Sequence, residues 1–551
     1  MDTNFIKTMI FIGLLMSLSA CNEIDHQKVF LEQNDVTLIE NDPVSGWYKF
    51  PLALKLDSGA IYRSSSIKNK AGYYTSNASY LDLGNELTLN TSYFNENLLG
   101  SNSTIMKSNI LKGTDVMEWA APKTRNLKTG GVVFFKNYDK EKWTSRIYFD
   151  ASKKLDDKLM VVSLIVDPND LFNYDTGIYL QGVLGDFNDP KKGNYSKRGK
   201  GAQRKSFVHF FENDGDLRFK TNAGVKIHGN LSRAQPQKSF TLLFRSKFGS
   251  KPIFSNLYGD TKYLHRMILR TPFTSSMQGQ SLIMDSFIGE VAQKMNLDAM
   301  GSIPCNLYLN GEYWGIYHLR EKVDQFYLKE KYSISKESIE IVEFNKGYKD
   351  NFKACYGEKN NWISLMTYIG NHDISKAECY EYVSQKIDLN NLIDYLILST
   401  FFANKDWPGN NFKFWRSSDL DSKWRFIVQD MDACFRNDDM FNYLLTKNQT
   451  KGNNIASSTL LFRKLFKNKE FRNKFTSKYK ELIEDELQTK NLILDLNVMV
   501  DKIAPSIQHQ IDRWHMPVSY DSWEKRIEKM RIYLEKRARK YNEHMKNMPY
   551  E

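Results

Sequence analysis

The order of local sequence patterns along the chain is the feature that most restricts its fold. Short apolar or alternating runs, which favour β-strands, come first, at residues 161–166, 207–211, 225–228 and 240–244. Patterns with helical spacing follow, at residues 281–295 and 391–402 and in much of the chain beyond Leu444, including 522–546. Strands followed by helices indicate an α+β fold, and we find no internal repeat.

The first part of the chain differs in texture from the rest. Residues 21–159 are rich in Ser, Thr, Asn and Tyr, with short alternating runs between turn-forming residues, which predicts a β-sandwich-like module. It would be a spacer or a sugar-binding module. We place the main domain after it, with a core at 160–440 and a helical C-terminal part at 441–551 of the 551-residue chain.

The N-terminus has the features of an export signal. A lysine at position 7 is followed by an apolar run over 9–16, which is too short to span a bilayer and typical of a signal peptide. The sequence Leu-Ser-Ala-Cys at 18–21 resembles the bacterial lipobox, which predicts a signal peptide at 1–20 and a lipid-anchored Cys21. We therefore expect a lipoprotein of the cell envelope, at the outer membrane or cell surface. The alternative is an ordinary secretory signal in which the cysteine occurs by chance.

Charge and cysteine content limit the possible partners. Lys and Arg number 77 against 65 Asp and Glu, a net charge of +12 spread over a long chain, and no nucleic-acid-binding motif accompanies it. We therefore expect no nucleic-acid partner. The five cysteines show no CxxC spacing, which disfavours zinc. Cys355 and Cys379 could pair in an oxidising compartment, but their spacing alone does not decide it.

Two acidic segments in the second half of the chain carry the strongest chemical signal. Asp406 and Asn411 have the D-x-x-x-x-N spacing of a kinase catalytic loop, where the Asp positions the nucleophile and the Asn binds magnesium. Asp430 ends an apolar strand, and we expect Asp432 on the same face because strand side chains alternate with period two. Two carboxylates at a strand end suit Mg²⁺ or Mn²⁺. The alternative is a solvated or calcium-stabilised turn.

Around these segments the chain resembles the CotH kinase family of atypical secreted protein kinases. The resemblance runs from about Leu164 to Trp514. Its motifs are D-P-N-D-L-F-N-Y-D-T-G-I-Y at 167–179, G-V-K-I-H-G-N-L-S-R at 224–233, P-Q-K-S-F at 236–240 and L-N-G-E-Y-W-G-I-Y at 309–317, followed by the two acidic segments.

This resemblance implies a kinase-like fold that binds ATP with Mg²⁺ or Mn²⁺ and phosphorylates a protein substrate. By position in the family's motifs, Asp406 would be catalytic, and the metal would be held by Asn411, Asp430 and Asp432. The resemblance also implies three cofactor-binding residues, with Lys238 contacting phosphate, Arg233 as a second phosphate contact, and Glu321 orienting Lys238.

The chain departs from the family pattern after the second acidic segment. Arg436 stands where a glycine is usual, and Gln429 stands where an aromatic residue is common. ATP is also scarce outside the cytoplasm, so the alternative function is a cell-envelope scaffold that binds glycan or protein and retains the kinase fold. A two-carboxylate glycosidase is disfavoured, because its acid and base must face each other across a sugar. We expect Trp314 and Trp407 to be core or loop-anchoring aromatics.

Overall fold

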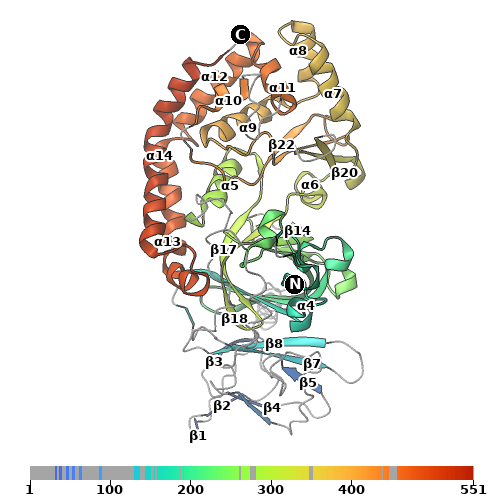
Figure 1. The fold of residues 1–551 in the computed structure, drawn as a ribbon, viewed down its shortest axis with the longest axis vertical. Helices are drawn as coiled ribbons and strands as arrows, with labels where there is room; N and C mark the ends of the chain where they lie inside the picture. The colour runs from blue at the N-terminus through green and yellow to red at the C-terminus, as the bar shows by residue number, and fades with distance from the viewer. Residues whose placement is uncertain are drawn as a thin grey trace, which may run out of the picture.

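The computed structural model describes the chain from Leu159 almost to its end, together with separate strands before residue 151. The described residues are 32–33, 36–39, 45–48, 52–55, 61–64, 86–89, 130–136, 143–150, 154–155, 158–186, 188–189, 191–259, 262–272, 281–345, 351–436, 438–445 and 456–549. The predicted signal peptide, its lipidation site Cys21 and the run at 9–16 lie outside these residues. The described part of the chain is mixed α and β, as the sequence predicts (Figure 1).

Two small sheets precede the main domain, at the bottom of Figure 1. The first has the order β1 (Glu32–Gln33), β2 (Val36–Ile39), β4 (Leu52–Lys55) and β6 (Glu86–Leu89). The second has the order β3 (Gly46–Tyr48), β8 (Trp143–Asp150), β7 (Gly130–Lys136) and β5 (Ile61–Ser64). The N-terminal region is therefore β-rich, while its arrangement as a sandwich stays a prediction.

A closed barrel of seven strands forms the centre of the described structure. Around the barrel the order is β10 (Arg204–Phe211), β11 (Leu217–Ile227), β12 (Phe240–Leu243), β15 (Arg266–Arg270), β18 (Glu312–Glu321), β17 (Ser302–Leu309) and β9 (Met160–Val166). The pairing of β17 with β9 is parallel and the other pairings are antiparallel. Apolar side chains such as Val225, Leu242 and Leu269 are buried in one core on one face of these strands.

The barrel is joined to the preceding sheets by aromatic contacts. Trp47 stacks on Phe149 with ring centroids 4.5 Å apart, and Phe149 meets Tyr308 of the barrel at 5.0 Å. Two further short strands, β13 (Ile253–Ser255) and β14 (Lys262–Leu264), form a hairpin before β15.

A second sheet carries the acidic segments found in the sequence. Its order is β16 (Asp298–Ala299), β22 (Arg425–Val428), β21 (Phe412–Ser417), β19 (Ile339–Phe344) and β20 (Phe352–Tyr356). Helix α9 (Leu389–Phe401) packs against it, and Asp388 caps the helix because its carboxylate accepts a hydrogen bond from the Asn391 amide at 3.1 Å.

The remaining helices mostly surround this second sheet (Figure 1). They are α4 (Pro168–Phe172), α5 (Met284–Lys294), α6 (Gln325–Tyr332), α7 (Asn360–Asn371), α8 (Ala377–Ser384), α10 (Met440–Leu445), α11 (Ala456–Leu465), α12 (Lys469–Glu484), α13 (Thr489–Trp514) and α14 (Tyr520–Lys546). No helix of the described chain is long and apolar enough to cross a membrane.

The two long C-terminal helices run side by side along one edge and link the barrel to the helical lobe (Figure 1). At the barrel, the Trp514 indole donates a hydrogen bond of 2.7 Å to the Trp314 carbonyl, and Arg513 forms a buried ion pair with Glu312 at 3.1 Å. At the other lobe, the Tyr533 hydroxyl of α14 donates to the Phe401 carbonyl at 2.7 Å. These contacts fix the barrel relative to the second sheet, and the site lies between the two.

Candidate active site

The first part of the site is the segment that follows β22. The strand ends at Val428, and Asp430 has the left-handed backbone conformation with φ of 57°. The expectation that Asp430 and Asp432 share a face through strand alternation is therefore wrong. The two carboxylates nevertheless converge, because the chain turns at Asp430 instead of continuing as a strand.

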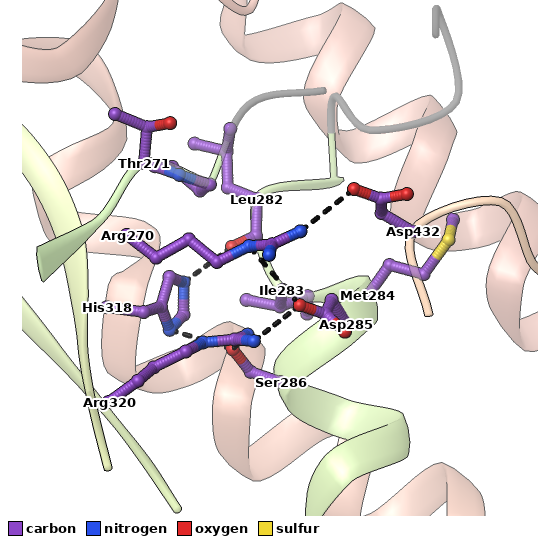
Figure 2. A pocket seen from close by; sticks show the side chains of 11 residues that line it. Arg270, Thr271, Leu282, Ile283, Met284, Asp285, Ser286, His318, Arg320 and Asp432 are labelled. Atoms are coloured by element: carbon purple, nitrogen blue, oxygen red, sulfur yellow. Dashed lines mark hydrogen bonds and ion pairs between the residues drawn. The ribbon is translucent and has the colours of Figure 1, made fainter. Parts of the chain in front are cut away.

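They converge on the guanidinium of Arg270, the last residue of barrel strand β15, and Figure 2 shows its contact with Asp432. A single nitrogen, Arg270 Nη2, lies 2.5 Å from Asp430 Oδ1 and 3.0 Å from Asp432 Oδ2. Arg270 Nε also lies 3.4 Å from Asp285 Oδ2. One half-buried guanidinium thus faces three carboxylates from two separate elements.

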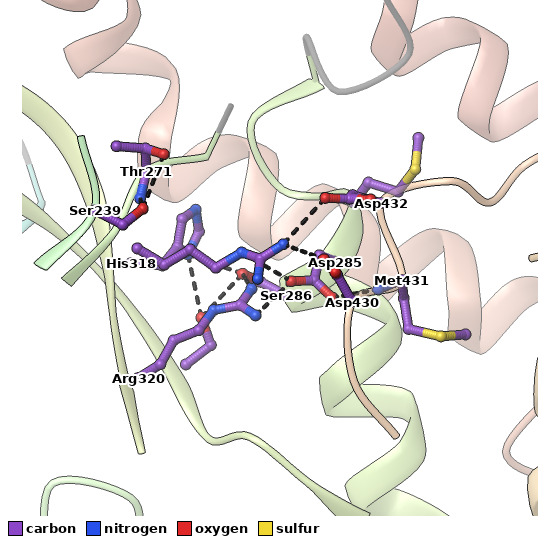
Figure 3. Close-up of polar contacts among 12 residues, drawn as sticks. Ser239, Thr271, Asp285, Ser286, His318, Arg320, Asp430, Met431 and Asp432 are labelled. Atoms are coloured by element: carbon purple, nitrogen blue, oxygen red, sulfur yellow. Dashed lines mark hydrogen bonds and ion pairs between the residues drawn. The ribbon is translucent and has the colours of Figure 1, made fainter. Parts of the chain in front are cut away.

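Asp285 in the first turn of α5 holds the cluster together. Its carboxylate forms an ion pair with Arg320 of β18 and accepts a hydrogen bond of 2.7 Å from the amide of Met431, the residue between the two acids (Figures 2 and 3). Arg320 Nη2 also donates to the Ser286 hydroxyl at 2.8 Å. Helix α5 therefore ties the barrel to the acidic segment.

Burial and charge set the protonation of this cluster. Burial raises the pKa of Asp285, but the charges of Arg320 and Arg270 outweigh it and hold that pKa below its usual value. Burial and then the neighbouring Asp430 raise the pKa of Asp432 well above the usual value, against the opposing effect of Arg270. The pKa values of Asp285 and Asp432 are thus shifted in opposite directions, and Asp432 is the one that binds a proton more readily than a free Asp.

The second part of the site is the loop between α9 and β21, which contains Asp406 and Asn411. Asp406 and Asn411 are half-buried, and Asn411 has a φ of 57°. The loop runs beside the acidic segment: the Lys405 amide donates to the Ala433 carbonyl at 3.3 Å, and the Phe435 amide donates to the Phe402 carbonyl at 2.8 Å.

Side-chain contacts also join the two segments. The Asn404 amide nitrogen lies 3.2 Å from Met431 Sδ, and Gln429 Nε2 donates to the Asn411 carbonyl at 3.5 Å. Burial, followed by the charges of Asp432, Asp285 and Asp406, raises the pKa of the Cys434 thiol well above its usual value. The structure thus brings together the two segments that the sequence analysis identified, at residues 404–411 and 430–432.

The model of the family described as CotH kinase protein matches residues 225–541, more than half of the chain, including both acidic segments. The chain belongs to the CotH kinase family. No curated protein matches it.

The cations that the CotH kinase resemblance implied are placed elsewhere. Lys238 is buried, and its ammonium donates to the carbonyls of Arg233 at 2.7 Å and Gln235 at 2.8 Å. Arg233 in turn donates to the carbonyls of Gly229 at 2.6 Å and Tyr195 at 2.8 Å. Both side chains thus hold the loop between β11 and β12, and neither has a described contact with the acidic cluster.

The predicted pairing of Lys238 with Glu321 is wrong. Glu321 is the last residue of strand β18, and its carboxylate binds Lys262 of β14 at 2.9 Å. An acidic residue of helix α5, Asp285, instead contacts a cation at the end of a barrel strand, Arg270. Lys238 meets Tyr195 instead, with its ammonium 4.2 Å from the ring centroid.

Asp285, Arg270 and Arg320 are site residues that sequence reasoning missed. The available signal was an alternation of charged and apolar residues in R-M-I-L-R at 266–270 and H-L-R at 318–320. Residues directly opposite each other on neighbouring strands lie on the same face of the barrel. The strand register places four residues on one face in this way: Lys226, Thr241, Ile268 and Arg320. Since side chains alternate along strands, Arg266 and Arg270 share this face, which is turned away from the barrel core.

The same face lines a pocket beside α5 (Figure 2). Its walls are formed by Arg270, Thr271, Pro272, Leu282, Ile283, Met284, Asp285, Ser286, His318, Arg320 and Asp432. Within the described chain, no group of three or more His, Cys, Asp or Glu side chains is arranged to hold a metal ion by itself. Any metal here would therefore need oxygen ligands from elsewhere, such as Asn411, water or a bound phosphate.

Proposed function

We propose that this chain is an atypical protein kinase that uses a divalent metal to transfer the terminal phosphoryl group of ATP to a protein acceptor outside the cytoplasm. The observation that carries the proposal is the convergence of Asp430 and Asp432 on one point, beside the loop that contains Asp406 and Asn411. Positioned charge, rather than covalent chemistry, does most of the work in phosphoryl transfer.

The acidic pair fits a divalent cation by the chemistry of its donors. Carboxylate oxygens from Asp430 and Asp432 both reach a single nitrogen, so both can reach one cation placed nearby. Mg²⁺ and Mn²⁺ prefer oxygen ligands and commonly bind through one or two carboxylates plus substrate phosphates. Asn411 would add an amide oxygen. When bound, the metal would neutralise charge on the phosphates.

Asp406 would orient the acceptor hydroxyl and accept its proton. Its half-buried position on a loop tied to residues 433–435 keeps it near the metal ligands without sealing it from solvent. A carboxylate in this role needs reach to the acceptor and a fixed loop.

Arg270 and Asp285 would play the part of the lysine–glutamate pair of protein kinases. In those enzymes a strand cation contacts phosphate and is oriented by a carboxylate of the following helix. Here the cation is on β15, and the carboxylate is on α5, the next helix along the described chain. Lys238 and Arg233 would act indirectly, by fixing the loop between β11 and β12.

The kinase proposal is tested by phosphate transfer from radiolabelled ATP with Mg²⁺ or Mn²⁺ to the chain itself and to envelope proteins. The full chain, purified in detergent, is compared with Asp406→Asn and Asp430→Asn. Asp521→Asn is the matched control, since Asp521 is exposed on α14 and pairs only with Lys525 in the described structure. Metal-dependent incorporation that both site variants lose and the control keeps supports the proposal.

The absence of nucleotide binding in a folded protein would overturn it. That result would favour the alternative of an envelope scaffold that binds glycan or protein. Glycan affinity that survives Asp430→Asn would be the positive sign of this alternative.

For the location, we propose lipid anchoring through Cys21 in the cell envelope. A chain with the lipobox and an exported kinase domain would meet protein substrates at the outer membrane or the cell surface. Cys21→Ala should abolish the lipid mass on the N-terminal peptide and release the chain from membranes. An unchanged membrane fraction without lipid mass would contradict the anchor.

A further inference from the structure

We propose that Arg270 is a built-in competitor of the divalent metal: its guanidinium takes the place of the cation between Asp430 and Asp432, and a polyphosphate anion must draw it away before metal binds. This inference rests on the proposed function and adds an order of events to it. Metal and nucleotide would bind together. The polyphosphate would draw away the Arg270 guanidinium that blocks the metal, and the metal would replace Arg270 as the partner of Asp430 and Asp432.

The geometry puts the guanidinium and a metal in competition for the same oxygens. Arg270 Nη2 lies within 3.0 Å of an oxygen from each carboxylate. Mg²⁺ requires oxygen ligands at about 2.0–2.1 Å in a nearly octahedral shell. A divalent cation held by these two oxygens would compete with the guanidinium for their lone pairs and would be repelled by its positive charge. Each therefore weakens the binding of the other.

When Arg270 moves away, Asp285 is not left as an unpaired charge in the interior. The Asp285 carboxylate keeps its ion pair with Arg320 and its hydrogen bond from the Met431 amide when Arg270 moves. A divalent metal would at the same time replace the charge that Asp430 and Asp432 lose. The exchange therefore leaves every carboxylate of the cluster paired.

The face of the barrel that carries Arg270 offers a destination for it. Lys226 lies on the same face, and Lys322 follows two residues after Arg320. Neither lysine has a carboxylate within ion-pair distance among the residues that the structure describes. Burial, together with the neighbouring cations Arg266, Lys413 and Lys226, lowers the pKa of Lys322 to about 8, against the opposing effect of Asp324. An array of unneutralised cations attracts a highly charged anion, and a polyphosphate bound there would recruit Arg270.

The test uses two measurements on one variant that must move in opposite directions. Binding of Mn²⁺ to the full chain without nucleotide is followed by the electron paramagnetic resonance of free Mn²⁺. Binding of ATP in excess EDTA is followed by calorimetry. We expect Arg270→Gln to bind Mn²⁺ at least about tenfold more tightly than the unaltered chain and to bind metal-free ATP at least about tenfold more weakly.

Two further variants keep the test decisive. Arg266→Gln removes an arginine from the same strand and face, where it pairs with Asp324 at 2.8 Å, and should leave Mn²⁺ affinity unchanged. If Arg270→Gln does not fold, as judged by its thermal unfolding, Arg270→Lys takes its place. A lysine keeps a charge that can still contact Asp430 and Asp432 but has no second nitrogen for Asp285, so it should raise Mn²⁺ affinity by a smaller factor.

An unchanged or weaker Mn²⁺ affinity in a folded Arg270 variant would overturn the inference. So would tight Mn²⁺ binding by the unaltered chain without nucleotide. The Mn²⁺ measurement needs neither ATP nor catalysis, so competition by Arg270 is decided even if the kinase proposal fails. In that case the unaltered chain would show no phosphate transfer, while the Mn²⁺ result stands on its own.

Discussion

Arg270 and Asp430 are 160 residues apart in sequence, yet their side chains meet at 2.5 Å and join the barrel to the segment after β22. Asp285 sits beside this pair on α5 and contacts both arginines of the cluster. These ion pairs therefore also stabilise the fold, because they join a barrel strand, a helix and a loop at one point.

Replacing Asp285 should destabilise the fold as well as the site. In Asp285→Asn, Arg320 loses its acidic partner and Arg270 loses one of three. Removing one member of a buried ion pair leaves an uncompensated charge, so we expect a loss of about 3 kcal/mol in the free energy of unfolding. Urea denaturation followed by circular dichroism measures it, with Asp521→Asn as the exposed control. A loss below about 1 kcal/mol would show that the cluster is not structurally important.

Lys238→Met tests whether Lys238 serves the loop or the nucleotide. The ammonium satisfies two carbonyls and is buried, so its removal leaves those acceptors unpaired, at a cost of about 2 kcal/mol in the free energy of unfolding. We expect faster proteolysis between Gly229 and Lys238 in limited digestion. The affinity for metal-free ATP should change less than in Arg270→Gln. A larger loss of ATP affinity in Lys238→Met would return Lys238 to the role of a direct phosphate contact.

Local patterns predicted the elements well, for identifiable reasons. The apolar run at 161–166 lies in β9, and the helical spacing at 391–402 matches α9, which begins after the capping residue Asp388 and ends at Phe401. Trp314 and Trp407 are buried, as expected for core aromatics. Each of these outcomes depends on residues close together in sequence, where periodicity and capping are decisive.

The partners within the site could not be predicted in the same way. Nothing near Arg270 in sequence indicates that it faces residues 160 positions away, because that contact depends on how the barrel packs against the second sheet. The pairing of Lys238 with Glu321 failed because it rested on the analogy with the lysine and helix glutamate of protein kinases, whereas the structure places Lys262 beside Glu321. Asp430 and Asp432 converge through a left-handed turn that their spacing does not reveal.

Cysteine reactivity separates a disulfide from free thiols. Cys305, Cys355, Cys379 and Cys434 are free in the described structure, and Cys355 is the exposed one. The pairing of Cys355 with Cys379 is therefore absent. Brief treatment of the native chain with iodoacetamide at pH 8, followed by peptide mass analysis, should modify Cys355 and spare the other three. All four should react after unfolding. Labelling of Cys355 and Cys379 only after reduction would contradict this assignment.

Asp394 on α9 should make the fold less stable as pH rises. Burial raises its pKa to about 7, and its Oδ1 has no hydrogen-bond partner among the described residues. The native state thus binds this proton more tightly than the unfolded chain, whose Asp pKa is about 3.9. Between those values the native state holds more protons, so its contribution is fully retained below about pH 4 and is lost as pH rises towards 7.

Asp394→Asn removes this titration and keeps the size of the side chain. We expect the variant to be more stable than the unaltered chain at pH 8, by about 1–2 kcal/mol after allowing for partial exposure, and the two to converge near pH 4. Asp421→Asn is the opposite control, because hydrogen bonds from the Arg425 side chain lower the pKa of Asp421. The ionised Asp421 side chain stabilises the native state slightly at neutral pH, and this contribution is lost as the pH falls and Asp421 becomes protonated. Urea denaturation at a series of pH values measures both differences, and a gap for Asp394→Asn that does not change with pH would contradict the buried-acid explanation.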